Sequence, residues 1–143
     1  MLYRDKKKND LNEGKWIGVG GHVEKGESVT KCLKREVKEE TGLILNKYTY
    51  KGTIDFLNDN YPPERMYLYW SNSFEGDLIE CDEGELKWIK KSDLGSLPLW
   101  DGDRVFLPLV DSKQGVFSLT LLYKNGVYVG SKGPFYKQKR KRK

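Results

Sequence analysis

Residues 21–43 of the 143-residue chain read GHVEKGESVTKCLKREVKEETGL, and this stretch decides the fold. After Ser28 the apolar residues recur at the three- and four-residue spacing of an amphipathic helix. The Ser28 hydroxyl can cap the start of the helix, and Gly42 stands where the left-handed conformation that ends many helices favours glycine. We therefore predict a helix over residues 28–41, entered through a loop.

Three carboxylates of this helix, those of Glu36, Glu39 and Glu40, share one sector at about 100° per residue. The apolar side chains fall in the same sector: Val29, Cys32, Leu33 and Val37. Like charges three or four residues apart cost roughly 0.2–0.5 kcal/mol each, and acids near the C-terminus oppose the helix dipole. Two interpretations stay open: a solvated charged face, or carboxylates that bind a hard cation such as Mg²⁺.

A glycine pair, Gly20 and Gly21, precedes the helix. Glycine here provides a tight turn with positive φ, or lets the backbone approach a ligand closely so that a carbonyl reaches the same metal ion. The two interpretations are compatible. His22, the only histidine, follows as a surface loop residue or as a contact to a phosphate.

Outward from this stretch, alternating apolar and polar residues predict strands, and the glycine-punctuated residues 15–23 predict an extended segment. The predicted strands are residues 1–4, 47–57, 64–74, 86–90, 116–123 and 127–130. Residues 58–63 (NDNYPP) predict a loop between the second and third strands, and Asn125-Gly126 predicts a hairpin turn between the last two.

A second helix is predicted over residues 102–111, with Pro108 in its interior. The order of strands and helices predicts a mixed α/β (α+β) fold in which helices pack on a mixed sheet. We expect one domain over residues 1–136 and a basic tail over 137–143.

The net charge of +5 comes from that tail, which holds six of the 26 basic residues. The remaining 20 basic and 21 acidic residues leave a net charge of −1, so we expect no stable binding to nucleic acid. No apolar run reaches the roughly 20 residues of a membrane helix, and the charged N-terminus has no signal-peptide pattern. Two cysteines without a paired spacing favour a reducing, cytoplasmic compartment.

The stretch from Gly21 to Leu43 resembles a complete Nudix box, G-x5-E-x7-R-E-U-x-E-E-x-G-U, in which U is aliphatic. The nine matching positions are Gly21, Glu27, Arg35, Glu36, Val37, Glu39, Glu40, Gly42 and Leu43. A wider pattern, from NEGKWIGVGG through CDEGELKWI to LPLWDGDRVFLPL, resembles bacterial MutT-type 8-oxo-dGTP diphosphatases. The resemblance implies an α/β/α sandwich whose first strand is short or missing here.

The resemblance also implies a site for Mg²⁺, with Mn²⁺ as a possible substitute. The metal ligands would be the carboxylates of Glu36, Glu39 and Glu40, the carbonyl of Gly20 and a residue from a distant loop, Glu83 or else Glu85. Arg35 would hold a carboxylate by a bidentate ion pair. Glu27 would lie at the start of the helix in a structural or metal-supporting role. Either Glu36 or Glu83 would take the proton of the attacking water.

By the same resemblance, Trp100 and Asp103 would read the purine base, and Gly21 and His22 would contact the substrate. Trp100 as a core aromatic and Asp103 as an N-terminal helix residue are the alternatives. The implied reaction is hydrolysis of oxidised purine nucleoside triphosphates by a monomer or homodimer. ADP-ribose, dinucleoside polyphosphates or capped RNA stay open as substrates, as does a non-catalytic nucleotide-binding module.

Overall fold

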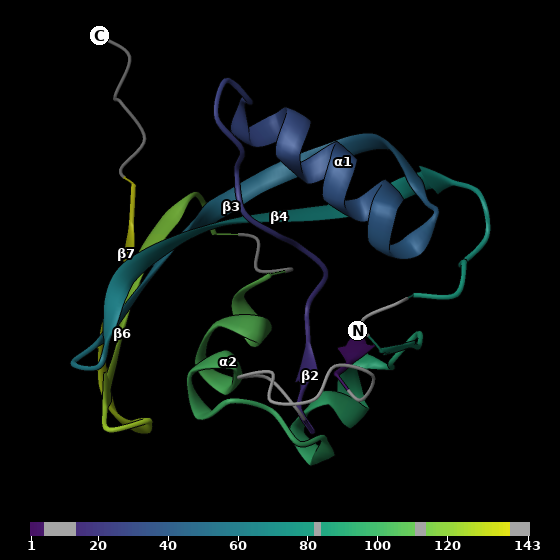
Figure 1. Ribbon diagram of the computed structural model, residues 1–143. Helices are drawn as coiled ribbons and strands as arrows, with labels where there is room; N and C mark the ends of the chain where they lie inside the picture. Colours follow the sequence, from purple (N-terminus) through teal and green to yellow (C-terminus); the bar gives the residue numbers. More distant parts are fainter. Residues whose placement is uncertain (5–13, 82–83, 111–113, 138–143) are drawn as a thin grey trace, which may run out of the picture. The chain divides into compact units, whose positions relative to one another are not determined.

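The computed structural model describes residues 1–4, 14–81, 84–110 and 114–137 (Figure 1). The chain divides into two compact units. The first unit comprises Met1–Lys47 and Asn72–Trp100, and the second comprises Tyr48–Ser71 and Asp101–Lys143. Within the described residues, no helix has both the length and the apolar character needed to cross a membrane.

A three-stranded sheet lies in the first unit, in the order β2-β1-β5. Strand β1 (Leu2–Tyr3) pairs antiparallel with β2 (Trp16–Ile17) and with β5 (Glu85–Leu86). The predicted first strand is therefore present but short, and Leu2 is fully buried.

One strand prediction for the first unit was wrong in extent. The strand predicted over 86–90 ends at Leu86, because β1 offers only two residues for pairing. Trp88 instead is 67% exposed and stacks on Phe74. Of the extended residues 15–23, only Trp16 and Ile17 pair in a sheet.

Helix α1 (Val29–Thr41) follows the prediction closely. The Ser28 backbone is extended, and its hydroxyl accepts a hydrogen bond from the Lys31 backbone N–H at 3.2 Å. Gly42 ends the helix in the left-handed conformation (φ 80°), and its N–H donates to the Lys38 carbonyl. A short 3₁₀ helix, η1 (Lys91–Ser96), was not predicted.

A four-stranded sheet has the order β4-β3-β6-β7. Its strands are β3 (Ile44–Asn58), β4 (Tyr61–Glu75), β6 (Phe117–Lys124) and β7 (Val127–Tyr136). Strand β3 runs parallel to β6, and β6 runs antiparallel to β7, so the predicted mixed sheet is confirmed. Both β3 and β4 have one end in the first unit.

The predicted loop over 58–63 was wrong in extent, since only Asp59 and Asn60 separate β3 from β4. Pro62 and Pro63 lie inside β4. Proline lacks an N–H for a sheet ladder, and β4 tolerates it because this strand is an edge of the sheet.

The predicted hairpin is confirmed between β6 and β7. Asn125 (φ 51°) and Gly126 (φ 77°) both take positive φ, as the two-residue turn that matches strand twist requires. Strand β7 extends to Tyr136, six residues beyond the prediction.

The second predicted helix is shorter than residues 102–111. Helix α2 spans Asp101–Phe106, and a 3₁₀ turn, η2 (Leu107–Leu109), continues it. Pro108 lies in this turn, where its ring and missing N–H oppose a further α-helical turn. Residue 111 lies outside the described residues.

The core of the second unit is a cluster of buried apolar side chains from β3, α2 and β6: Ile54, Phe106, Phe117, Leu119 and Leu121. Phe106 meets Phe56 of β3 edge-on, with 6.5 Å between ring centroids. Beyond Lys137, the tail lies outside the described residues.

Candidate active site

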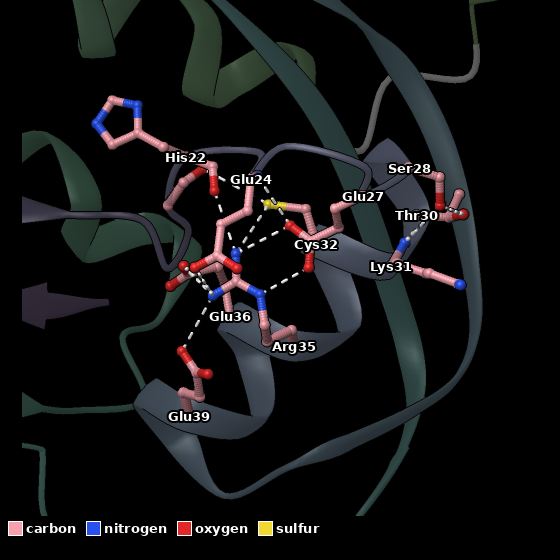
Figure 2. Close-up of polar contacts among 11 residues, drawn as sticks. His22, Glu24, Glu27, Ser28, Thr30, Lys31, Cys32, Arg35, Glu36 and Glu39 are labelled. Carbon is pink, nitrogen blue, oxygen red and sulfur yellow. Dashed lines mark hydrogen bonds and ion pairs between the residues drawn. The ribbon is translucent and has the colours of Figure 1, made fainter.

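Arg35, in the middle of α1, is the centre of the polar contacts around the predicted site (Figure 2). Its Nε and Nη2 donate to the two carboxylate oxygens of Glu27 at 2.7 and 3.0 Å. This is the bidentate ion pair that the resemblance implied, and it assigns Glu27 as the partner. Both side chains are largely shielded from solvent, with exposed fractions of 24% for Arg35 and 13% for Glu27.

The same guanidinium contacts two of the predicted metal ligands. Nη1 donates to Glu36 Oε1 at 2.8 Å and to Glu39 Oε2 at 3.2 Å. One nitrogen therefore lies between the carboxylates of both residues, as Figure 2 shows. Arg35 offsets the like-charge repulsion that the spacing of these acids predicts.

Arg35 also fixes the loop before α1. Its Nη2 donates to the carbonyl of His22 at 3.1 Å, and its Nη1 lies 3.8 Å from a carboxylate oxygen of Glu24. The Glu24 N–H donates to Glu27 Oε1 at 3.1 Å. The imidazole of His22 turns away from Arg35 in Figure 2, so His22 serves this network through its carbonyl.

The charges of this network shift two pKa values. The hydrogen bonds from Arg35 and from the Glu24 backbone lower the pKa of Glu27 from 4.5 to about 2, against a smaller opposing effect of burial. The pKa of Arg35 is raised, first by its hydrogen bond to Glu27. Glu27 is therefore a carboxylate at neutral pH.

Buried next to this ion pair is Cys32, a residue of the apolar sector. Its thiol lies 3.8 Å from the Gly21 carbonyl and 3.9 Å from Arg35 Nη2. Burial raises the pKa of the thiol, with the charge of Glu27 as the next cause. Cys32 therefore packs as a neutral side chain against the loop.

The glycine pair approaches the helix closely. A Cβ placed on Gly21 would overlap the carboxyl group of Glu36. Neither Gly20 nor Gly21 has a positive φ, so the tight-turn interpretation was wrong. The group approached is the Glu36 side chain. Close approach of this backbone to a ligand or a metal ion stays a prediction.

The three carboxylates of the acidic helix face differ in their exposure to solvent. Glu40 is only 8% exposed, and its Oε2 accepts a hydrogen bond from the Gly20 N–H at 3.1 Å. The side chain of Glu36 is 16% exposed and that of Glu39 is 58% exposed. Glu36 and Glu40 are therefore sheltered as the apolar sector predicts, whereas Glu39 is more exposed than predicted. The metal-binding role of all three stays a prediction.

The donor groups fit a hard divalent cation, because carboxylate and carbonyl oxygens are the ligands that Mg²⁺ prefers. In the part of the chain that the structure describes, no three His, Cys, Asp or Glu side chains are grouped so as to hold a metal ion. Here Glu36 and Glu39 contact Arg35, and Glu40 contacts Gly20. Glu83 lies outside the described residues, and its role stays a prediction.

Glu85, the alternative to Glu83, is in β5 and pairs with Lys87 at 3.6 Å. The two residues predicted to read the base, Trp100 and Asp103, belong to different units. In the first unit, the Lys15 ammonium lies over the ring of Trp100, 5.1 Å from its centroid. In the second unit, Asp103 is a residue of α2 and is only 9% exposed.

Sequence reasoning missed several contributors to these contacts: Lys15, the backbone and carboxylate of Glu24, and the thiol of Cys32. Cys32 was assigned to the apolar sector only. No local signal marks Lys15, since the cation–π contact joins residues far apart in the sequence. Glu24 precedes Glu27 by three residues, the spacing of a turn. This spacing could have indicated the hydrogen bond from the Glu24 N–H to the Glu27 carboxylate.

Comparisons with known proteins show the family of this chain. The NUDIX domain family matches residues 1–110. An uncharacterized Nudix hydrolase, YvcI of Bacillus subtilis, is 33% identical over 115 residues, which cover 77% of this chain and 73% of that protein. The oxidized purine nucleoside triphosphate hydrolase of Danio rerio is 28% identical over 110 residues, covering 76% of this chain and 70% of that one.

A solved structure, the MutT protein from Bacillus halodurans, is similar to this fold with a TM-score of 0.77 and 25% identity. The similarity covers 92% of this chain and 86% of the MutT chain. Nine box positions, the contacts of Arg35 with three of the others and the family match over residues 1–110 support one conclusion. The chain is a hydrolase that belongs to the Nudix family.

Proposed function

We propose that this Nudix hydrolase is a Mg²⁺-dependent pyrophosphohydrolase that removes oxidised purine nucleoside triphosphates, such as 8-oxo-dGTP, from the nucleotide pool. Its products would be the nucleoside monophosphate and pyrophosphate. The observation that carries the proposal is the network in which Arg35 contacts Glu27, Glu36 and Glu39. The similarity to the Danio rerio enzyme supports the substrate class.

In this proposal, Glu36, Glu39, Glu40 and the Gly20 carbonyl hold Mg²⁺, joined by Glu83 from a distant loop. Mn²⁺ can take the same oxygen ligands. When bound, the metal neutralises phosphate charge and lowers the pKa of a bound water.

The protein's own groups have separate tasks. Arg35 holds Glu36 at a fixed position, with Glu27 as the anchor of the guanidinium. Glu36 or Glu83 accepts the proton of the water as its oxygen bonds to phosphorus. The phosphoanhydride P–O bond breaks, and pyrophosphate leaves with the electron pair. Arg35 also keeps its positive charge near the carboxylates throughout this step.

Substrate selection is proposed for residues outside the box. Trp100 would stack on the base, and Asp103 would accept a hydrogen bond from the base edge. Gly21 and His22 would contact the phosphates. The shielding of the Asp103 carboxylate supports this role, because a buried acceptor discriminates strongly between bases that can and cannot donate to it.

The test is a substrate panel of 8-oxo-dGTP, dGTP, ADP-ribose and a dinucleoside tetraphosphate, with Mg²⁺ and with release of pyrophosphate and phosphate as readouts. A kcat/KM for 8-oxo-dGTP well above that for dGTP, lost in Glu39→Gln, supports the proposal. Activity only on ADP-ribose or the dinucleotide, or on capped RNA in an added assay, keeps the metal site and refutes the oxidised-purine substrate.

A second comparison tests catalysis against a binding module that uses the basic tail. Residues 1–136 act as one domain in our proposal, as a monomer or homodimer without stable nucleic-acid binding. Deletion of residues 137–143 should therefore leave kcat/KM unchanged. If the deletion abolished function while Glu39→Gln did not, the binding module would be supported instead.

A cytoplasmic location is also proposed. Cys32 and Cys81, the two cysteines of the chain, are buried and neither is in a disulfide. Thiols in this state suit a reducing compartment.

A further inference from the structure

Gly102, the second residue of α2, makes a contact in the second unit that no motif predicted. Its backbone N–H donates a hydrogen bond to the hydroxyl of Tyr123, from β6, at 2.8 Å. Gly102 is buried and Tyr123 is half-buried. The bond joins residues 21 positions apart, so it fixes the first turn of α2 to the sheet.

Position 102 has no room for a side chain while this hydroxyl is in place. A Cβ on Gly102 would overlap Tyr123 Oη and would lie 2.8 Å from Leu121 Cδ1. Leu121 is fully buried, so it cannot move aside cheaply. Glycine within a helix lowers its stability by about 1 kcal/mol relative to alanine. Glycine is nevertheless found here because a side chain at position 102 would occupy the space of the Tyr123 hydroxyl.

The Tyr123 side chain is held from several directions. Its ring meets Tyr128 of β7 edge-on, with 5.6 Å between centroids. Burial raises the pKa of Tyr123 above 10, and the nearby charges of Asp103 and Asp101 raise it further, while the Gly102 N–H opposes the rise. The phenol is therefore protonated at neutral pH and accepts from Gly102 as a neutral hydroxyl.

Asp103 follows Gly102 directly, so whatever fixes Gly102 also fixes the backbone that carries the Asp103 carboxylate. We propose that Tyr123 is a positioning residue: by holding Gly102, its hydroxyl sets the place of the Asp103 carboxylate and thereby the preference between purine bases. This inference rests on the proposed function, in which Asp103 accepts a hydrogen bond from an N–H of the base. The ligand class is a purine nucleotide whose base presents such an N–H.

A matched pair of variants tests the inference. Tyr123→Phe removes the hydroxyl and keeps the ring, whereas Tyr128→Phe removes a hydroxyl from the neighbouring ring. The kcat and KM for 8-oxo-dGTP and dGTP are measured for both. In Tyr123→Phe we expect the 8-oxo-dGTP preference to fall about 3- to 10-fold, which corresponds to one hydrogen bond. The loss should appear in KM with kcat nearly unchanged, and Tyr128→Phe should keep the preference.

The action through Asp103 is tested by combining Tyr123→Phe with Asp103→Asn. If Tyr123 acts by placing Asp103, the preference in the double variant should equal that in Asp103→Asn alone. An equal effect of Tyr123→Phe in both backgrounds, or no effect in either, would overturn the inference. Thermal melting of each variant confirms that it is folded.

The outcomes also separate this inference from the proposed function. If Asp103→Asn leaves the preference unchanged, the base-reading role of Asp103 is wrong and the inference falls with it. If Asp103→Asn lowers the preference and Tyr123→Phe does not, only the inference is wrong. If the wild type does not prefer 8-oxo-dGTP, the proposed substrate is wrong. In that case the KM of the best substrate is compared among Tyr123→Phe, Asp103→Asn and the double variant. If the effects of the two substitutions on KM simply add, the inference is overturned.

Discussion

At the scale of single residues, Gly21 and Glu36 depend on each other. Gly21→Ala places a methyl group where the Glu36 carboxyl lies, so the carboxylate must move. We expect kcat to fall by at least about tenfold, since small misplacements of catalytic groups have large effects on rate. Gly18→Ala is the matched control, because a Cβ there meets nothing within 4 Å. Equal activity in both variants would contradict a catalytic role for Glu36.

The ion pair between Arg35 and Glu27 predicts a pH dependence of stability. The folded-state pKa of Glu27, about 2, lies below the unfolded value of 4.5. The pair therefore stabilises the protein fully above pH 4.5, and this stabilisation is lost as the pH falls toward 2. In metal-free buffer, the difference in Tm between wild type and Glu27→Gln should shrink over that range. A difference that stays constant would refute the assignment.

How well the sequence predicts the contacts of these residues depends on how far apart the contacting residues are in the chain. Helical periodicity places Glu36, Glu39 and Glu40 in the apolar sector of α1 without any tertiary information. Glu36 and Glu40 are sheltered there, whereas the Glu39 side chain is 58% exposed. The choice of Glu27 as the partner of Arg35 depends on the path of an irregular loop, which has no periodicity to exploit. The bond between Gly102 and Tyr123 depends on β6 packing beside α2, so no local pattern marks it.

At the scale of elements, the ends of α1 carry their own signals, and the Ser28 cap can be tested alone. Ser28→Ala removes the acceptor of the Lys31 N–H, which should lower the free energy of unfolding by about 1 kcal/mol. Urea denaturation measures the change. Ser28→Thr keeps an oxygen at the cap and should retain most of the stability. Equal losses in both variants would show that packing at this position, and not capping, matters.

Strand lengths were less predictable than helix ends, for a physical reason. A strand continues only where a neighbour supplies backbone partners, and that neighbour is distant in the sequence. Strand β5 is short because β1 is short, and β4 includes Pro62 and Pro63 because it is an edge strand. By contrast, the Asn125-Gly126 turn is encoded locally, since these residues accept positive φ, and its prediction was confirmed.

At the scale of the whole molecule, the two compact units are not contiguous in sequence. The chain enters the second unit within β3, returns within β4 and enters it again at Asp101. No linker composition marks these crossings, because the first two fall inside regular strands and the third falls at the start of α2. A division of this kind follows from tertiary contacts, and composition along the chain could not have predicted it.

Metal binding should appear as a change in the stability of the whole molecule. A ligand that binds only the folded state stabilises it by RT ln(1 + [L]/Kd), which is about 2.7 kcal/mol at 100 times the Kd. The Tm of the wild type should therefore rise progressively over the whole range of Mg²⁺ concentrations in a titration. Glu40→Gln should reduce the rise, because the neutral amide is a weaker ligand than the carboxylate.

Ser28→Thr provides the comparison for this last measurement, since it alters α1 without touching a carboxylate. Its Tm should rise with Mg²⁺ as much as that of wild type. If Glu40→Gln rose equally, the cation would be acting on general surface charge, and the assignment of Glu40 as a ligand would be wrong. Calcium, which prefers more ligands at longer distances, should give a different dependence on concentration when the carboxylates form a defined site.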